Sequence, residues 1–399
     1  MTKQDEQPKR SSFIGQMLKV LYAPHKVFKE IKEKPKMIGP ILILILFIAA
    51  NLGFAYAVMS KTYVEQILPT GEKLDEWTEN ATLWTSPSGA AIRENFDDFI
   101  NGSYYGNRSI EFSAVNSMQI SMQLDNIGPV NCSGPDGYKN LSLRIKLTSP
   151  ITNPENASIY LFSSTHSDNF YYNLTQTFSS LNVSNWNNLT IPLGNENWIS
   201  GSPNADWNAI TGLKTEFAWP EDSNITLLVD GLFFRGIFKT PLDIAATSYL
   251  LNYSSNSLMQ FLVQWIILGG LIYLMIRGLG AQTSLKLVLI LIGFALMVLL
   301  IQAVINAAIF SALPRLYYSL EFIGGVQGES EIAYNNIWQG VAIFQTISIY
   351  LRIVIYVWTV GLCTFATRSI SEFSWRKSLL IAAVSFLGSL TLMSLLLGV

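Results

Sequence analysis

The chain has 399 residues, of which half are apolar and only 14% are charged. Soluble globular domains carry about 25% charged residues, so this composition favours a membrane protein. The net charge is −2, from 26 basic and 28 acidic residues, which excludes a strongly basic nucleic-acid-binding chain. Two histidines and two cysteines are too few for a disulfide scaffold, a histidine-based zinc site or a Ser-His-Asp triad.

The first 37 residues form a basic segment with 9 Lys or Arg against 4 Asp or Glu. Between Ser11 and Lys36, apolar side chains recur at helical spacing on both sides of a break at Pro24. This pattern predicts two short helices that lie on a membrane surface. Six lysines would then face anionic headgroups, namely Lys19, Lys26, Lys29, Lys32, Lys34 and Lys36. The alternative is a soluble helical tail whose charged pairs are solvated.

Five apolar stretches are long enough to cross a hydrocarbon core of about 30 Å as helices. They cover residues 38–58, 257–276, 287–311, 336–362 and 378–398. A secretory-signal interpretation of the first stretch is weak, because the 37 residues before it are too long for an ordinary n-region. The composition and these stretches together predict a membrane α-helical bundle with five transmembrane helices.

Lys and Arg near the helix ends predict the orientation, because short basic segments stay on the cytoplasmic side. The basic residues 1–37, the loop with Arg277 and Lys286, and the turn from Arg368 to Lys377 are therefore expected inside. Alternation then places residues 59–256, the loop from Pro314 to Asn335 and the C-terminus outside. The plasma membrane is the expected location.

Residues 59–256 differ in character from the rest of the chain and predict a separate domain outside the membrane. They hold 23 of the 27 asparagines and a net charge of −10. Eleven Asn-x-Ser/Thr triplets lie here and none elsewhere, more than composition alone predicts, so they are candidate N-glycosylation sites. They begin at Asn80, Asn101, Asn107, Asn131, Asn140, Asn156, Asn173, Asn182, Asn188, Asn224 and Asn252.

Within this domain the apolar period is two, as in Leu141–Leu147, Ser158–Phe162 and Asn224–Asp230. Recurrent turn signals predict about eight short strands, and hence an all-β jelly-roll sandwich over about residues 85–240. Helical periodicity is expected only at its borders. There, Tyr63–Trp77 would extend the first membrane helix and Pro241–Leu251 would lead into the second.

Candidate ligand-binding residues in the sandwich are aromatic, because aromatic faces stack on sugar rings. They are Trp186, Trp198, Trp207, Trp219, Tyr171 and Tyr172, for which core packing is the stronger expectation at any single Trp. Asp230 is a candidate ligand of a structural Ca²⁺, and no cofactor is otherwise required. Asp206 and Asp230 would be the carboxylate pair of an envelope-processing hydrolase, a minor alternative.

Arg352 is the charged residue inside a predicted span, where a charge at the helix centre costs about 2.5–3.5 kcal/mol. One interpretation gives it a polar partner such as Asn306 or Gln302 on the third span, or a headgroup in a cavity. The other lets it reach the membrane surface from a tilted helix. Both remain open from the sequence. No P-loop, zincin, nucleophile-elbow or Cys-x-x-Cys motif is present, so the sequence predicts no enzyme.

The segment Leu21-Tyr-Ala-Pro-His-Lys-Val-Phe28, continuing to Pro35 before the first span, resembles the opening of prokaryotic Yip proteins, the Ypt/Rab-interacting five-span membrane proteins. Trp358-Thr-Val-Gly-Leu, Arg368-Ser-Ile-Ser and Trp375-Arg-Lys-Ser resemble that family's fourth span, inner turn and fifth span. The resemblance implies a cytoplasmic N-terminus and a non-catalytic role in membrane organisation through protein partners. The large domain after the first span departs from the family pattern.

A second resemblance lies in the domain itself. Trp186–Leu193, Trp207–Leu213 and Leu227–Phe234 are similar to the last strands of jelly-roll, galactose-binding-like modules. Such modules commonly bind carbohydrate and often hold a structural Ca²⁺ near the final strand, which here implies Asp230. The leading hypothesis is therefore a non-enzymatic tether in the lipid bilayer. It has a cytoplasmic protein partner inside and an external domain that recognises a glycan or envelope polymer. A transporter or channel subunit, with Gln302, Asn306, Gln345 and Arg352 along a polar path, is the alternative.

Overall fold

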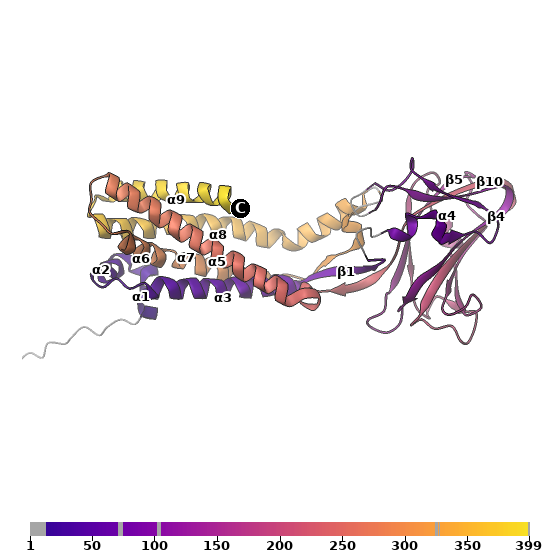
Figure 1. The fold of residues 1–399 in the computed structure, drawn as a ribbon, viewed down its shortest axis with the longest axis horizontal. Helices are drawn as coiled ribbons and strands as arrows, with labels where there is room; N and C mark the ends of the chain where they lie inside the picture. The colour runs from indigo at the N-terminus through magenta and orange to yellow at the C-terminus, as the bar shows by residue number, and fades with distance from the viewer. Residues whose placement is uncertain (1–12, 71–74, 102–104, 324–325, 327, 398–399) are drawn as a thin grey trace, which may run out of the picture. The chain divides into compact units, whose positions relative to one another are not determined.

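The computed structural model describes residues 13–70, 75–101, 105–323, 326 and 328–397. These fall into two compact units (Figure 1). The helical unit takes its residues from the ranges 1–62, 240–316 and 339–399, and the β unit from 63–239 and 317–338. The β unit thus includes the segment before the fourth membrane helix as well as the domain that follows the first.

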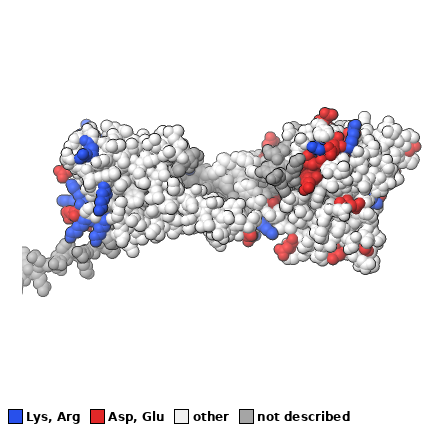
Figure 2. Space-filling model, viewed as in Figure 1, with Lys and Arg blue, Asp and Glu red and all other residues white. Residues whose placement is uncertain are grey.

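The helices of the described chain match the five predicted spans. Their bounds are α1 Phe13–Tyr22, α2 Pro24–Glu33, α3 Ile38–Lys61, α5 Pro241–Gly278, α6 Leu285–Ala295, α7 Met297–Ser311, α8 Glu329–Ser371 and α9 Trp375–Leu397. Five helical stretches, with α6 and α7 counted together, are long and apolar enough to cross a membrane. The prediction of a five-helix membrane bundle is confirmed. Figure 2 shows the long sides of this unit almost without charged side chains.

Helix α5 is much longer than the span predicted inside it, and its start has a local cause. Thr240 accepts a hydrogen bond from the backbone N–H of Asp243, whose carboxylate accepts from the N–H of Thr240, and Pro241 fills the first helical position. This capping box begins the helix before Leu251, as the periodicity predicts. Ala245 leaves the helical region with φ −156°, so the first turns of α5 are kinked.

The amphipathic helices α1 and α2 use their apolar stripes differently from the prediction. Val27, Phe28 and Ile31 of α2 are buried in the core of the helical unit, where α2 contacts α6. In α1 the predicted stripe divides, because Met17 is buried whereas Leu18 is 52% exposed. The apolar side of α2 therefore packs on protein. Contact with protein removes these side chains from water just as contact with lipid would.

The strands of the β unit are β1 Thr62–Leu68, β2 Trp84–Thr85, β3 Ala91–Asn95, β4 Ser109–Val130, β5 Asn140–Ser149, β6 Asn156–Phe162, β7 Asn169–Asn173, β8 Asn187–Pro192, β9 Ile199–Ser200, β10 Ile210–Lys239 and β11 Leu316–Tyr318. Short helices lie at α4 Thr175–Ser179 and, as 3₁₀ turns, at Glu76–Thr78, Ala81–Leu83 and Leu320–Ile323. The helical extension predicted over Tyr63–Trp77 is wrong, because its first residues form β1, which pairs with β10.

Two long strands, β4 and β10, build the sandwich by passing from one sheet to the other. The first part of β10 pairs with β6 and with the end of β4, while its second part pairs with β5 and with the start of β4. The β4–β10 register shifts between Ala218 and Ile225, where both strands turn the corner. All these pairings are antiparallel, and the predicted antiparallel sandwich is confirmed.

Alternating side chains place the core between the two sheets. In β10, Leu213 and Phe217 point inward and are at most 1% exposed, and Val229 does the same in the second sheet. The residues of β10 that alternate with these inward residues point outward, on both sheets. The outward face of the first sheet is therefore mainly polar, whereas that of the second sheet holds Asp230 beside the buried apolar residues Leu228 and Phe233.

Candidate functional site

The outward face of the first sheet carries a group of neighbouring polar and aromatic side chains from β4, β10, β6 and β7, which we call the polar face. The β10 register sets Glu216 opposite Ser121 of β4 and opposite Ser158 of β6, so all three lie on this side. Lys214 of β10 likewise lies opposite Gln123 and Tyr160. The full set is Gln119, Ser121, Gln123, Asp125, Asn156, Ser158, Tyr160, Tyr171, Lys214 and Glu216.

Side-chain contacts hold several of these groups in place. The Lys214 ammonium lies 2.9 Å from Glu216 Oε1 and 4.5 Å from the centre of the Tyr160 ring. Tyr160 packs against Tyr171 across the β6–β7 pair, with ring centres 5.2 Å apart. Partial burial raises the pKa of Tyr160 above its ordinary value, so this hydroxyl stays protonated and can donate a hydrogen bond.

A cavity of about 240 Å³ opens on the polar face. Ser88, Gln119, Ser121, Asn156, Ser158 and Glu216 supply its polar walls. Further along the same face, Asp125 accepts a hydrogen bond from Gln123 at 2.9 Å and lies 2.9 Å from His166 Nε2. Amide, hydroxyl and carboxylate groups beside an aromatic pair can bind a ligand that has many hydroxyl groups.

The tryptophans named from the sequence lie elsewhere. Trp198, Trp207 and Trp219 are at most 7% exposed and belong to the core between the sheets. Trp186 is half-buried and donates its indole N–H to Asp98 Oδ1 at 3.1 Å. Of the tyrosines, Tyr172 packs on the core whereas Tyr171 lies on the polar face. We therefore propose Tyr171, and not the four tryptophans or Tyr172, as a ligand contact.

Sequence reasoning did not assign Gln119, Gln123, Lys214 or Glu216 to any site. A signal was nevertheless present in Thr211–Ala218, where Lys214 and Glu216 alternate with Leu213 and Phe217. The alternation predicts that the two charged residues share one outward face. It does not predict that the polar residues of β4 and β6 stand beside them, because strand pairing over long separations decides that.

Asp230 lies on the outward face of the second sheet but is only 1% exposed. Its carboxylate accepts a hydrogen bond from the backbone N–H of Ile100 at 2.7 Å. Burial, together with the charges of Asp75 and Glu79, raises the pKa of Asp230 well above its ordinary value. Among the described residues, no group of three or more His, Cys, Asp or Glu side chains is placed to hold a metal ion. The role of Asp230 as a Ca²⁺ ligand stays a prediction.

The two carboxylates of the hydrolase alternative lie in different surroundings. Asp206 is exposed in the loop before β10 and accepts a hydrogen bond from Asn208 N at 2.9 Å. Asp230 is buried in the second half of the same strand. The two carboxylates thus have separate hydrogen-bond partners, Asn208 for Asp206 and Ile100 for Asp230.

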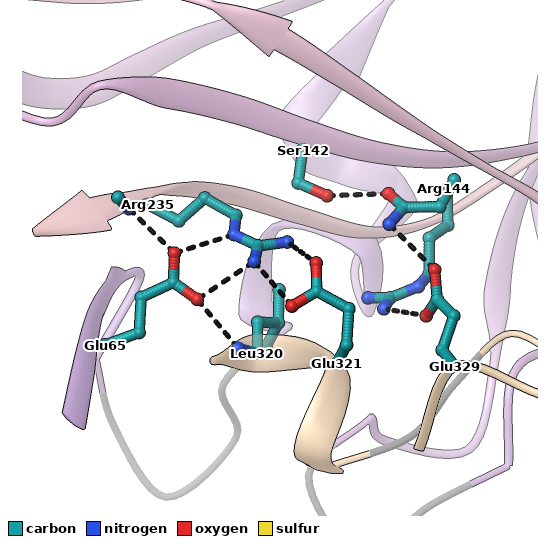
Figure 3. Close-up of polar contacts among 9 residues, drawn as sticks. Glu65, Ser142, Arg144, Arg235, Leu320, Glu321 and Glu329 are labelled. Atoms are coloured by element: carbon teal, nitrogen blue, oxygen red, sulfur yellow. Dashed lines mark hydrogen bonds and ion pairs between the residues drawn. The ribbon is translucent and has the colours of Figure 1, made fainter. Parts of the chain in front are cut away.

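A buried ion-pair cluster, which we call the arginine latch, joins the sandwich to the segment 317–338 (Figure 3). Arg235 of β10 contacts two carboxylates at once. Its Nε donates to Glu65 Oε1 at 2.9 Å and its Nη2 to Glu321 Oε2 at 2.7 Å. Glu65 also accepts from the backbone N–H of Leu320 at 2.7 Å. Burial raises the pKa of Glu321, but its bonds to Arg235 outweigh this and lower the pKa to about 2.

A second arginine joins the same two parts of the β unit. Arg144 of β5 is fully buried and donates from Nη2 to Glu329 Oε2 at 2.9 Å, at the first residue of α8 (Figure 3). Asn188 donates to the other oxygen of Glu329 at 2.9 Å, and it accepts from Ser142 at 2.8 Å. Glu321 and Glu329 are thus each held to the sandwich by an arginine.

The glycosylation candidates differ in accessibility. All but Asn140 and Asn188 are exposed. The Asn188 side-chain nitrogen, to which a glycan would attach, is the one that donates to Glu329, so a glycan there would break the contact. Asn252 lies on α5 in the helical unit and not among the strands. Glycosylation of the exposed sites stays a prediction.

Arg352 and Asn306, two of the intramembrane polar residues, lie in different surroundings. Arg352 of α8 is exposed on the surface of the helical unit. Asn306 of α7 instead accepts a hydrogen bond from Ser348 of α8 at 3.5 Å. This arrangement agrees with an arginine that extends along the lipid-facing side of its helix toward the membrane surface.

Arg352→Leu is expected to leave the fold intact and to keep or raise the thermal stability of the full chain in nanodiscs. The reason is that leucine is favourable at a lipid-facing position, whereas arginine costs up to about 3 kcal/mol near the bilayer centre. Thermal unfolding of both proteins in the same nanodiscs measures the difference. A clearly lower Tm for the variant would show that Arg352 has a polar partner.

Solved structures with some likeness to the chain contain β-sandwich modules. One is described as a carbohydrate-binding module from the β-sandwich superfamily, with 11% identity, a TM-score of 0.28, and coverage of 41% of this chain and 60% of that one. The family 11 module of a cellulosomal cellulase of Clostridium thermocellum has 16% identity, a TM-score of 0.27, and coverage of 41% and 94%. A β-1,2-glucanase from Parabacteroides distasonis has 14% identity, a TM-score of 0.29, and coverage of 39% and 24%. This chain therefore spans less than two thirds of the first and third proteins.

No curated protein sequence matches the chain. Residues 206–397, however, match the family model described as the Yip1 domain. The matched residues include β10 and the helices from α5 onward, and they contain the Trp358–Ser378 pattern; the pattern at residues 21–35 lies outside them. The chain is therefore a membrane protein in which residues 206–397 are similar to the Yip1 domain, with a β-sandwich domain between the first and second membrane helices.

Proposed function

We propose that this protein is a non-enzymatic membrane tether whose β unit lies outside the cell and binds a glycan or another envelope polymer. The polar face carries the proposal. Its cavity of about 240 Å³ is lined by amide, hydroxyl and carboxylate side chains, and the Tyr160–Tyr171 pair lies on the same sheet face. Sugars present hydroxyl edges and apolar ring faces, and these two kinds of group match them.

The proposed placement of the β unit outside rests on charge and on chain grouping. The segment 317–338 belongs to the same compact unit as residues 63–239. That grouping agrees with a chain that crosses the membrane twice, through α5 and then through α6 and α7, and so returns to the side from which it started. The basic N-terminal segment and the turn from Arg368 to Lys377 then lie inside, as the distribution of Lys and Arg favours.

The inner end of the helical unit supplies the second contact of the tether. Side chains of α1 and α2 that do not pack on the bundle include Ile14 and Leu18, which are 63% and 52% exposed, and the exposed lysines of α2. This surface is suited to a cytoplasmic protein partner. The membrane-organising role and the plasma-membrane location are part of the same proposal.

The binding half of the proposal is tested with the full chain in nanodiscs on a glycan array, followed by purified envelope polymer. We expect retention by at least one glycan class and a loss of binding of tenfold or more in Tyr160→Ala/Tyr171→Ala. Each stacked aromatic contributes on the order of 1 kcal/mol beyond its burial. The matched control is Tyr172→Ala, because Tyr172 is next to Tyr171 in β7 but packs on the core.

The control should lower stability and leave the binding of the folded fraction unchanged. Two results contradict the proposal. In the first, neither glycans nor envelope polymer retain the wild-type chain. In the second, binding survives in the double variant at its wild-type affinity.

A further inference from the structure

A pocket at one end of the helical unit has no part in the proposed glycan binding. Its volume is about 580 Å³, and it lies between α2, the end of α8 and the start of α9. The cations at its walls are Lys29 and Lys32 of α2 and Arg368 of α8. Figure 2 shows Lys and Arg gathered at one end of the helical unit, next to sides that carry few charged residues.

Arg368 is the centre of the pocket. Its guanidinium carbon lies over the Trp375 ring, 4.1 Å from the ring centre, in a cation–π contact. Its buried Nη1 has no hydrogen-bond partner among the described residues. A buried donor of this kind is costly unless something accepts a hydrogen bond from it, such as a water or a ligand that enters the pocket.

The remaining walls are of two kinds. Trp375 is 48% exposed and packs edge-on against Phe365 at 5.0 Å, which gives the pocket an apolar side. Glu33 and Glu372 also line it, and Glu372 lies 3.6 Å from Lys32. Three cations and two carboxylates give the pocket a net positive charge. The carboxylates can accept hydrogen bonds from hydroxyl groups of a ligand.

We propose that this pocket binds the phosphate-bearing headgroup of an anionic membrane lipid. A phosphate accepts two parallel hydrogen bonds from a guanidinium, and Lys29 and Lys32 add point charges. The glycerol and the first acyl carbons lie against Trp375 and Phe365, at the depth where aromatic side chains sit in membranes. The ligand is the lipid and not free phosphate, because free phosphate would leave the exposed indole in contact with water.

The test uses the full chain in detergent, titrated with three probes and followed by native mass spectrometry. The probes are dioctanoyl phosphatidylglycerol, dioctanoyl phosphatidylcholine with the same tails, and inorganic phosphate. We expect the anionic lipid to bind at least tenfold more tightly than the zwitterionic lipid, and we expect inorganic phosphate to bind more weakly than either. Equal binding of both lipids, or tightest binding of inorganic phosphate, overturns the proposal.

Variants then locate the binding. Arg368→Gln should weaken binding of the anionic lipid at least tenfold, because a charge-assisted hydrogen bond is lost. Lys29→Gln/Lys32→Gln removes cations from an exposed or half-buried helix surface, so folding is preserved and the same loss is expected. Lys26→Gln/Lys34→Gln is the matched control, with the same change of charge at exposed positions outside the pocket. An equal loss in the control and in the pocket variants would mean diffuse attraction and would refute the site.

Discussion

Arg235→Ala is expected to destabilise the β unit by about 3–5 kcal/mol, the usual cost of removing one partner from a buried ion pair. Arg235 is 6% exposed and contacts Glu65, whose side chain is 2% exposed. Without the guanidinium, Glu65 would be left as a buried charge, and Glu321 would lose its ion-pair partner in the described chain. The free energy of unfolding is measured by urea titration of the full chain, with pulse proteolysis of the β unit as the readout.

Lys239→Ala is the matched control, because Lys239 is an exposed cation on the same strand. Its loss should change the free energy of unfolding by less than about 0.5 kcal/mol, as is usual for surface substitutions. An equal effect of the two substitutions would show that the arginine latch contributes no more than net charge.

The same latch predicts how stability depends on pH. Because Arg235 lowers the pKa of Glu321 to about 2, below the value of about 4.3 in an unfolded chain, the folded state favours the ionised carboxylate. This contribution is fully present above about pH 5 and is lost as the pH falls from there toward 2. Glu321→Gln should flatten that part of the stability profile, and an unchanged profile would contradict the assignment.

Trp207→Ala is expected to cost about 3–5 kcal/mol of stability, as large-to-small substitutions of core aromatics do. The Trp207 ring stacks on Phe170 with centres 4.0 Å apart and meets Trp198 edge-on at 5.6 Å. Its indole N–H donates to Asn195 Oδ1, so the side chain is satisfied inside the fold. Urea titration of the full chain, as above, measures the loss.

Tyr171→Ala provides the comparison, since Tyr171 is a half-buried aromatic residue on the outward face of β7. It should cost clearly less stability than Trp207→Ala while it weakens glycan binding. The reverse pattern, a stable Trp207 variant that no longer binds glycan, would return Trp207 to the ligand-contact role that the sequence left open.

Some of the fold follows from local sequence because its cause is local. The apolar stretch between Lys36 and Lys61 matches the thickness of a bilayer, and α3 is found there. The period of two in Leu141–Leu147 predicts a strand, and these residues lie within β5. In each case a run of adjacent residues carries the whole signal.

The helix predicted over Tyr63–Trp77 failed for the opposite reason. Glu65 has its partner in Arg235, 170 residues later in the chain, and β1 forms by pairing with that distant strand. The residues next to Glu65 in the sequence do not include this partner. The prediction therefore relied on the local helical spacing of apolar residues alone. Long-range strand pairing overrides local preference in this way.

By itself, the sequence determined five apolar helices, an asparagine-rich sandwich between the first two, and a basic N-terminal segment. These features follow from hydrophobic length, alternation and charge, which are properties of consecutive residues. Only the tertiary structure decided that Trp198 and Trp207 are core while Tyr160 and Tyr171 face outward. It also decided that Arg368 stacks on Trp375. The physical reason is that side-chain burial and ion pairing depend on which distant segments come into contact. Composition does not determine these contacts.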